Sequence, residues 1–362
     1  MYLVRSLRAR CRPGCGFIPS STDRVLILVR SFSDTPRLPN KARDTVEVET
    51  PTISASVLKF MLYNTVQRYP LFGKMRIIMS ARLTKMYAEV DRIVAGARHV
   101  TIDESRLAEH FDGLQDFYQG YLNRENRPRD PKLSEICFYL LANSINFCFW
   151  SGKANSHPAG AGSSTVWKFV NAALDAYSKP NDILAHFYAL VAESKLPPLE
   201  ERLAILQEMR PYFGSKLAAL RHACLLGSDA KTSLEALVEL FPSFGKDSLV
   251  KRASLMLQLL HEDTLFAVDI ESLPIPADYQ VPKVLNAWGV LRYSPDLTQR
   301  ISTEQLLSSE SAEETEIRAA TIRVGDLIRQ RIEVPPHVSD RFIWTQRKAY
   351  PGPYHLTITT CY

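Results

Sequence analysis

The chain has 362 residues, of which 46% are hydrophobic and 23% are charged, and a formal net charge of +5. This is an ordinary globular composition, and the length allows one large hydrophobic core or two smaller ones. No apolar run reaches the roughly 18 to 20 residues that are needed to cross a bilayer, so we expect a soluble protein without a membrane partner.

The positive charge lies almost entirely at the N-terminus. Residues 1–43 hold nine Lys or Arg and two Asp, which leaves a net charge of about −2 on the remaining 319 residues. A body this close to neutral lacks the broad basic surface that binds a polynucleotide, whereas a mononucleotide needs only a local basic patch. We therefore expect no polynucleotide partner.

The basic leader contains four arginines and several serines before the first acidic residue, Asp23. This composition is typical of a mitochondrial transit peptide, although a disordered basic tail or a start codon assigned too far upstream would produce it as well. The leader thus favours a mitochondrial location, with a cytoplasmic one as the alternative. Residues 31–43, rich in Ser, Pro and charge, are predicted to form a linker, and folded structure is expected from about residue 50.

The six cysteines are scattered, and no CxxC pair or Cys/His cluster has the spacing of a zinc site. In a chain this long the scatter predicts reduced thiols. Sequence signatures of zinc hydrolases, serine hydrolases and kinases are absent. The glycine-rich residues 159–164 lack the Gly-Lys-Ser/Thr ending of a phosphate-binding P-loop and are expected to form a flexible loop. We therefore predict neither a metal nor a cofactor.

Apolar residues recur at helical spacing along the body, and strands are scarce, which predicts an all-α or nearly all-α fold. Thr101 and Glu104 have the order of a capping box, and the apolar face from residue 107 to 114 predicts that a helix starts there. A long amphipathic helix is expected near the end of the chain. The other predicted helices cover residues 133–149, 166–177, 183–194, 199–209, 217–226, 233–241 and 249–261, and the long one covers residues 313–332.

Three segments are candidates for chemistry. Residues 143–150 place amides beside three aromatic rings at the end of an apolar helix. Amides can hydrogen-bond to the edge of a heterocycle and aromatic rings can stack on its face, a combination that holds nucleobases. Taken alone, such a segment more often packs into the core.

The second segment, residues 274–285, combines an acidic side chain with the predicted start of a helix. Pro282 suits the first turn, so Asp278 is expected just before or at the N-terminus, where a carboxylate meets free backbone N–H groups. An N-cap would by itself explain the Asp. The third segment, residues 314–319, lies on the long helix, where its charges alone indicate a solvated or salt-bridged face.

In this order, the three segments closely resemble the queuosine salvage proteins, the queuosine 5′-phosphate N-glycosylases. The strings that carry the resemblance are Asn-Phe-x-Phe-Trp at residues 146–150 and Ala-Asp-Tyr-x-x-Pro-x-Val-Leu at residues 277–285. Shorter similarities occur at residues 99–102, 197–202, 240–244, 251–253 and 289–294. The resemblance covers about residues 85–362, and it divides the chain into a leader and linker (1–43), an N-terminal extension (44–84) and a glycosylase-like helical domain (85–362).

The resemblance implies a helical domain similar to the helix-hairpin-helix DNA glycosylases, and hydrolysis of the N-glycosidic bond of queuosine 5′-monophosphate. The products would be queuine, for tRNA modification, and ribose 5-phosphate, and the enzyme would be a monomer that needs no cofactor. Asp278 matches the family carboxylate that stabilises or captures the positive charge that develops at the ribose C1′. The resemblance places further residues at the substrate, namely Asn146, Phe147, Trp150, Lys251, Pro276, Tyr279, Thr345 and Gln346.

The chain departs from the family pattern at two of these places. Pro276 stands where the family usually has an aromatic residue, and Thr345 and Gln346 stand where it usually has an Asp-Tyr pair. Thr345 can offer a neutral hydrogen bond but no charge, so an acidic contact to the substrate is missing.

Two hypotheses of different class follow. In the first, the chain is an active nucleotide hydrolase in which Asp340, Asp326 or Glu316 supplies the acidity that Thr345 cannot. In the second, it is a degenerate homologue that binds queuine or its nucleotide without turnover, or the product of an incorrectly assembled gene model. DNA glycosylase activity is disfavoured, because the body is nearly neutral and a fold alone does not establish a substrate.

Overall fold

The computed structural model describes residues 81–123, 128–150, 162–225, 227–267 and 269–362, all of which lie in a single compact unit, Phe60–Tyr362. Within these residues the chain forms fourteen α-helices, three short 3₁₀ helices and one two-stranded antiparallel sheet. The prediction of a nearly all-α fold is therefore confirmed. The predicted leader and linker and the start of folded structure near residue 50 lie outside the described residues, as do residues 159–161 of the glycine-rich segment. The rest of that segment is not the expected loop, because Gly162 is the N-cap of a helix and Ser163 and Ser164 are its first residues.

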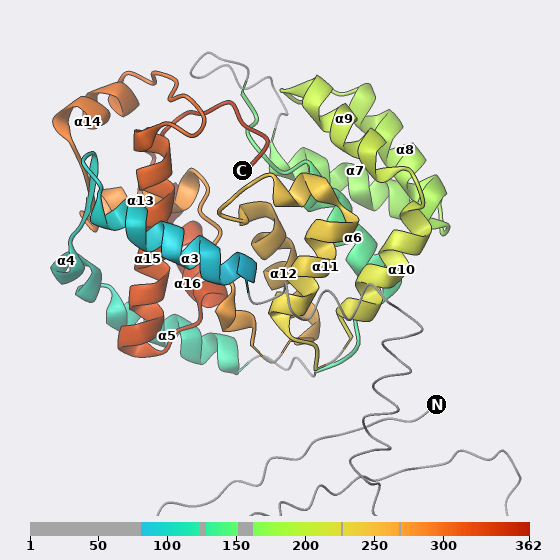
Figure 1. Cartoon of the computed structure of the whole chain (residues 1–362), viewed down its shortest axis with the longest axis horizontal. Helices are drawn as coiled ribbons and strands as arrows, with labels where there is room; N and C mark the ends of the chain where they lie inside the picture. Colours follow the sequence, from blue (N-terminus) through green and yellow to red (C-terminus); the bar gives the residue numbers. More distant parts are fainter. Residues whose placement is uncertain (1–80, 124–127, 151–161, 226, 268) are drawn as a thin grey trace, which may run out of the picture. The chain divides into compact units, whose positions relative to one another are not determined.

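The helices form two groups, which Figure 1 separates by colour. One group joins the first and last helices of the unit (blue to teal, and orange to red), because α3 packs across α15, and α16 packs on α5, α13 and α15. It consists of α3 (Ala81–Ala95), α4 (Glu104–Ala108), α5 (Phe111–Leu122), α13 (Gln280–Ala287), α14 (Pro295–Ser302), α15 (Ala312–Ile332), α16 (Pro336–Thr345) and the 3₁₀ helix η3 (Gln346–Lys348), with strands β1 (Val100–Ile102) and β2 (Leu291–Tyr293).

The other group is made from the middle of the chain (green and yellow in Figure 1), in which α6 packs on α7, α10 and α12, and α11 packs on α10 and α12. It consists of α6 (Leu133–Ser144), α7 (Ser163–Ala176), α8 (Pro180–Ala192), α9 (Leu199–Met209), α10 (Phe213–Ala223), α11 (Ala230–Leu240), η1 (Pro242–Gly245), α12 (Lys251–Thr264) and η2 (Ile270–Ser272).

Most predicted helices are present within a few residues of their expected bounds, and α9 covers the predicted residues 199–209. The helix predicted over residues 133–149 is shorter, because α6 ends at Ser144. Beyond it, the buried guanidinium of Arg202 donates hydrogen bonds to the carbonyl oxygens of Ile145, Phe147 and Cys148. These carbonyl oxygens therefore accept hydrogen bonds from a side chain distant in sequence, where a longer helix would have supplied backbone N–H donors.

The capping box predicted at Thr101 is wrong. Thr101 lies in β1, where it pairs with Arg292 of β2. Asp103 caps α4 instead, since its carboxylate accepts hydrogen bonds from the backbone N–H groups of Ser105 and Arg106. The single helix expected across residues 107–114 is divided at His110 into α4 and α5. Asp is as good an N-cap as Thr. Because Thr101 is paired within the sheet, the helix begins after Asp103 instead.

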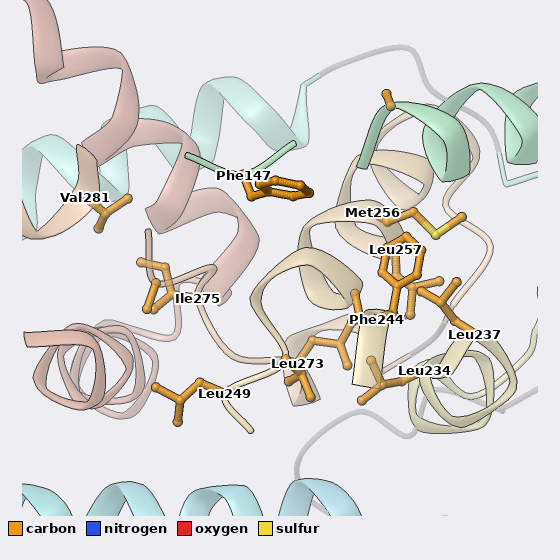
Figure 2. Close-up of a cluster of buried hydrophobic side chains, with 14 of the residues drawn as sticks. Phe147, Leu234, Leu237, Phe244, Leu249, Met256, Leu257, Leu273, Ile275 and Val281 are labelled. Atoms are coloured by element: carbon orange, nitrogen blue, oxygen red, sulfur yellow. The ribbon is translucent and has the colours of Figure 1, made fainter. Parts of the chain in front are cut away.

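The hydrophobic core runs through both groups of helices. Figure 2 shows part of it, in which Phe147 lies among aliphatic side chains from α11, α12 and the segment before α13. The four cysteines of the described residues are free thiols, as predicted. No helix of the described part is long and apolar enough to cross a membrane.

Candidate active site

Asp278 lies where the sequence predicts it, at the N-terminus of α13. Its Oδ1 accepts hydrogen bonds from the backbone N–H groups of Gln280 (2.7 Å) and Val281 (3.2 Å). Pro282 stands in the first turn, where its missing N–H costs nothing. These bonds use one carboxylate oxygen and fix the orientation of the half-buried side chain.

A buried ion pair holds the segment that carries Asp278. Arg318 of α15 donates through Nε to the carbonyl oxygen of Ala277 (3.1 Å) and through Nη2 to Oδ2 of Asp247 (2.7 Å). The same Asp247 oxygen accepts the backbone N–H of Lys251, the first residue of α12 (2.8 Å). One ion pair therefore ties the positions of Asp278 and Lys251 to α15.

Lys251 and Asp340 complete a charged cluster with Asp278. Burial lowers the pKa of Lys251, and the negative charges of Asp278 and Asp340 oppose that effect. Burial raises the pKa of Asp340 well above its ordinary value, and repulsion by Asp278 adds to the shift. The other charges that act on Asp340 are Lys251 and Glu262 of α12 and its neighbour Arg341. Asp340 therefore keeps its proton to a higher pH than an ordinary aspartate does.

Three aromatic rings stand next to this cluster. Tyr279 meets Trp150 edge to face, with ring centroids 4.9 Å apart, and lies 4.7 Å from Tyr354, which is 5.8 Å from Trp150. Burial, followed by the charges of Glu304 and Asp278, raises the pKa of Tyr354 to about 12. Tyr354 is thus within electrostatic reach of both carboxylates.

A cavity of about 330 Å³ opens against this aromatic cluster. It is lined by Trp150 and Tyr354, by Ser302 at the end of α14 and Glu304 just after it, and by the Pro-Gly-Pro segment at residues 351–353. An aromatic wall with one carboxylate beside it suits a flat heterocycle that carries a cationic substituent.

The other predicted site residues differ in how far they are buried. Phe147 is only 1% exposed, and its ring packs against the guanidinium groups of Arg202 (4.3 Å) and Arg252 (5.5 Å), so it lies in the core. Asn146 is half-buried, and Pro276 is buried in the segment that leads to Asp278.

Thr345 ends α16 and is exposed, and its hydroxyl donates a hydrogen bond back to the carbonyl oxygen of Phe342 (2.7 Å). Gln346 is half-buried and begins η3. The hydroxyl of Thr345 is therefore occupied by its own helix, and it adds no acid to the cluster.

The three acidic residues that could replace the acid missing at Thr345 lie in different surroundings. The carboxylate of Glu316 accepts the backbone N–H groups of residues 98–100, so it anchors β1. Asp326 lies 3.8 Å from Arg329, and the charges that act on it include neither Asp278 nor Lys251. Only Asp340 belongs to the same cluster as Asp278.

No sequence pattern marks Tyr354, Glu304 or Asp247 as site residues, and Arg318 lies in the charged candidate segment 314–319 without a predicted role at the site. Tyr354 and Glu304 lie in irregular segments without a helical period, and nothing local marks them as neighbours of Asp278. Within the described residues, no group of three or more His, Cys, Asp or Glu side chains could hold a metal ion.

Comparisons with known proteins agree with the resemblance. The family model described as queuosine salvage protein matches residues 126–347, more than half of the chain. Three curated relatives share the name queuosine 5′-phosphate N-glycosylase/hydrolase. The protein from Sphaerobacter thermophilus is 27% identical over 75% of this chain and 95% of its own length. Those from Schizosaccharomyces pombe and Mus musculus are 26% and 28% identical, over 67% and 58% of this chain and 84% and 71% of their own lengths. The chain therefore belongs to the queuosine salvage protein family.

Proposed function

We propose that this protein hydrolyses the N-glycosidic bond of queuosine 5′-phosphate and releases queuine and ribose 5-phosphate. The observation that carries the proposal is the cluster of Asp278, Lys251 and Asp340 beside an aromatic wall. The names of the relatives support the same reaction. The released queuine would be available for tRNA modification.

Asp278 is the proposed catalytic carboxylate. As the glycosidic bond breaks, positive charge develops on C1′ and the ring oxygen of the ribose. A carboxylate that two backbone N–H groups already hold in place can stabilise that charge without reorganising, or capture it as a covalent intermediate. Water then completes the hydrolysis.

Asp340 is the proposed proton donor. Burial and the nearby charge of Asp278 raise its pKa, so it keeps its proton to a higher pH than an ordinary carboxyl does. The departing deazapurine gains negative charge as the bond breaks, and a neutral acid can deliver a proton to it. This role would compensate for the acidic contact that is absent at Thr345.

The base would lie against the aromatic cluster. Trp150, Tyr279 and Tyr354 offer ring surfaces for the deazapurine. Asn146, four residues before Trp150 and half-buried, is the amide proposed to meet its edge. Queuine carries a secondary amine on its side chain, which is cationic at neutral pH. Glu304, at the wall of the adjoining cavity, has the charge to receive it.

The alternative is a homologue that binds the nucleotide without turnover. The site favours catalysis because Asp278 and Lys251 are both held by the Arg318–Asp247 ion pair, a buried arrangement that simple binding does not require. The helix-hairpin-helix likeness, the monomeric state and a mitochondrial location for the chain with its basic leader remain part of this proposal.

The test is incubation of the purified full chain with queuosine 5′-phosphate, with free queuine measured by mass spectrometry. We expect release by the wild type and a loss of about a thousandfold or more in Asp278→Asn. Asp296→Asn is the matched control, because Asp296 is an exposed carboxylate in the first turn of another helix, α14. Nucleotide binding without queuine release by the wild type would favour the non-catalytic homologue.

A further inference from the structure

Two basic residues, Lys283 and Arg347, meet next to the charged cluster. Lys283 of α13 donates a hydrogen bond from Nζ to the carbonyl oxygen of Arg347 in η3 (3.2 Å). Both side chains are half-buried, and the negative charge of Asp278 acts on both of them. The guanidinium of Arg347 lies 3.2 Å from the centroid of the Trp344 ring, and its Nη1 donates to the Trp344 carbonyl oxygen (3.0 Å).

Neither cation has a carboxylate partner within ion-pair distance in the described part of the chain. Burial lowers the pKa of both, and the charge of Arg347 further lowers that of Lys283. Two neighbouring cations that are partly removed from water are unfavourable unless an anion joins them. Asp278 supplies one negative charge, and Lys251 already faces it.

We propose that Lys283 and Arg347 bind the 5′-phosphate of the nucleotide. This inference rests on the proposed function, because Asp278 then marks the position of the ribose C1′. The 5′-phosphate is a short chain of bonds away from C1′, so its cations must lie close to Asp278 without belonging to the base pocket.

The arrangement meets that condition. Lys283 Nζ is 6.0 Å from the centroid of Tyr354, which borders the base pocket, and Arg347 stands on the 3₁₀ turn that follows α16, the helix of Asp340. The base, the reacting carbon and the phosphate would then each face a different part of one site. An arginine can donate two hydrogen bonds to a phosphate and a lysine adds a mobile point charge.

A structural role is the competing explanation, because the Lys283 hydrogen bond joins α13 to η3. Phosphate binding and a structural role predict different effects of a substitution on the two substrates, the nucleotide and the nucleoside. A phosphate contact acts only on the nucleotide, whereas a structural contact would affect the nucleotide and the nucleoside equally.

The experiment measures kcat/KM of the full-length protein on queuosine 5′-phosphate and on queuosine. The variants are Lys283→Gln, Arg347→Gln and the matched control Lys348→Gln, which removes an exposed charge from the same turn. We expect each of the first two to lower kcat/KM for the nucleotide by about tenfold to a hundredfold and to leave the nucleoside within about threefold. The control should stay within about twofold on both. An equal loss on both substrates would overturn the proposal.

A second measurement separates this inference from the proposed function. Calorimetric titration with ribose 5-phosphate needs no turnover, and the inactive Asp278→Asn protein can be used. Binding that is weakened at least tenfold by Lys283→Gln or Arg347→Gln would support the phosphate site even if no substrate were hydrolysed. Binding that is unchanged in both variants, or absent from the unsubstituted protein, would refute it.

Discussion

Replacing Arg318 with Met tests whether the buried ion pair organises the active site. The substitution keeps most of the side-chain volume but removes the 2.7 Å contact to Asp247 and the hydrogen bond to the Ala277 carbonyl oxygen. Asp247 is only 3% exposed and would remain as an unpaired buried carboxylate. Breaking such a pair costs about 3 to 5 kcal/mol, a large part of the roughly 5 to 15 kcal/mol that stabilises a typical protein.

The assay is urea unfolding of the full-length protein, with Arg331→Met as the matched control. Arg331 also lies on α15 and pairs with Glu104 at 3.0 Å, but both side chains are exposed, so its loss should cost less than about 1 kcal/mol. Arg318→Met should also lower kcat, since Ala277 adjoins Asp278. A loss of stability no larger in Arg318→Met than in Arg331→Met would refute the reasoning.

The pH dependence supplies an independent check. Burial alone would raise the pKa of Asp247, but Arg318 and the N–H groups of Lys251 and Leu249 outweigh it and hold that pKa below its ordinary value. In the wild type this stabilisation is fully present above the ordinary carboxyl pKa and is lost as the pH falls through the lower folded value. Without Arg318, burial raises the folded pKa instead, so the variant loses stability as the pH rises. The difference between the two proteins should therefore narrow from pH 7 to pH 5.

Three further predictions follow from the structure. Asp340→Asn should lower kcat by about a hundredfold or more and should abolish the fall of kcat/KM at high pH that loss of the Asp340 proton causes; an unchanged pH profile would exclude it as the acid. His261 and His337 are buried with their rings 5.5 Å apart, and burial lowers their pKa values to about 4 and about 3. The unfolded chain binds protons more readily than the folded protein at these two histidines. Their contribution to the free energy of unfolding should therefore be fully present above about pH 6.5 and should be lost as the pH drops towards 4. Urea unfolding at pH 7.5 and pH 5 should show a smaller difference in His337→Phe than in the wild type. A Cβ at Gly325 would lie 3.0 Å from the Cβ of Ile275. Gly325→Ala should therefore lower the free energy of unfolding by about 1 to 3 kcal/mol and reduce kcat, because it displaces the segment before Asp278. A wild-type free energy of unfolding together with a wild-type kcat would contradict that packing.

Local patterns predicted the helices well where one face is apolar and caps are unambiguous. The position of Asp278 at a helix N-terminus followed from Pro282 and the residues around it, and the structure confirms it. Two local expectations were overridden by distant partners. Thr101 pairs with Arg292 in the sheet and does not cap a helix, and the backbone carbonyls after α6 accept hydrogen bonds from Arg202 where a longer helix was expected. A pattern within a few residues carries no information about such partners.

The sequence by itself determined the nearly all-α architecture, the family and one carboxylate of the site. Only the tertiary structure brought Lys251, Asp278 and Asp340 together, placed Phe147 in the core, and selected Asp340 from three candidate acids. The physical reason is that helical periodicity and capping arise from neighbours within about four residues. The charges that shift a pKa and the rings that shape a pocket come instead from helices far apart in sequence, whose approach is decided by the packing of the whole core.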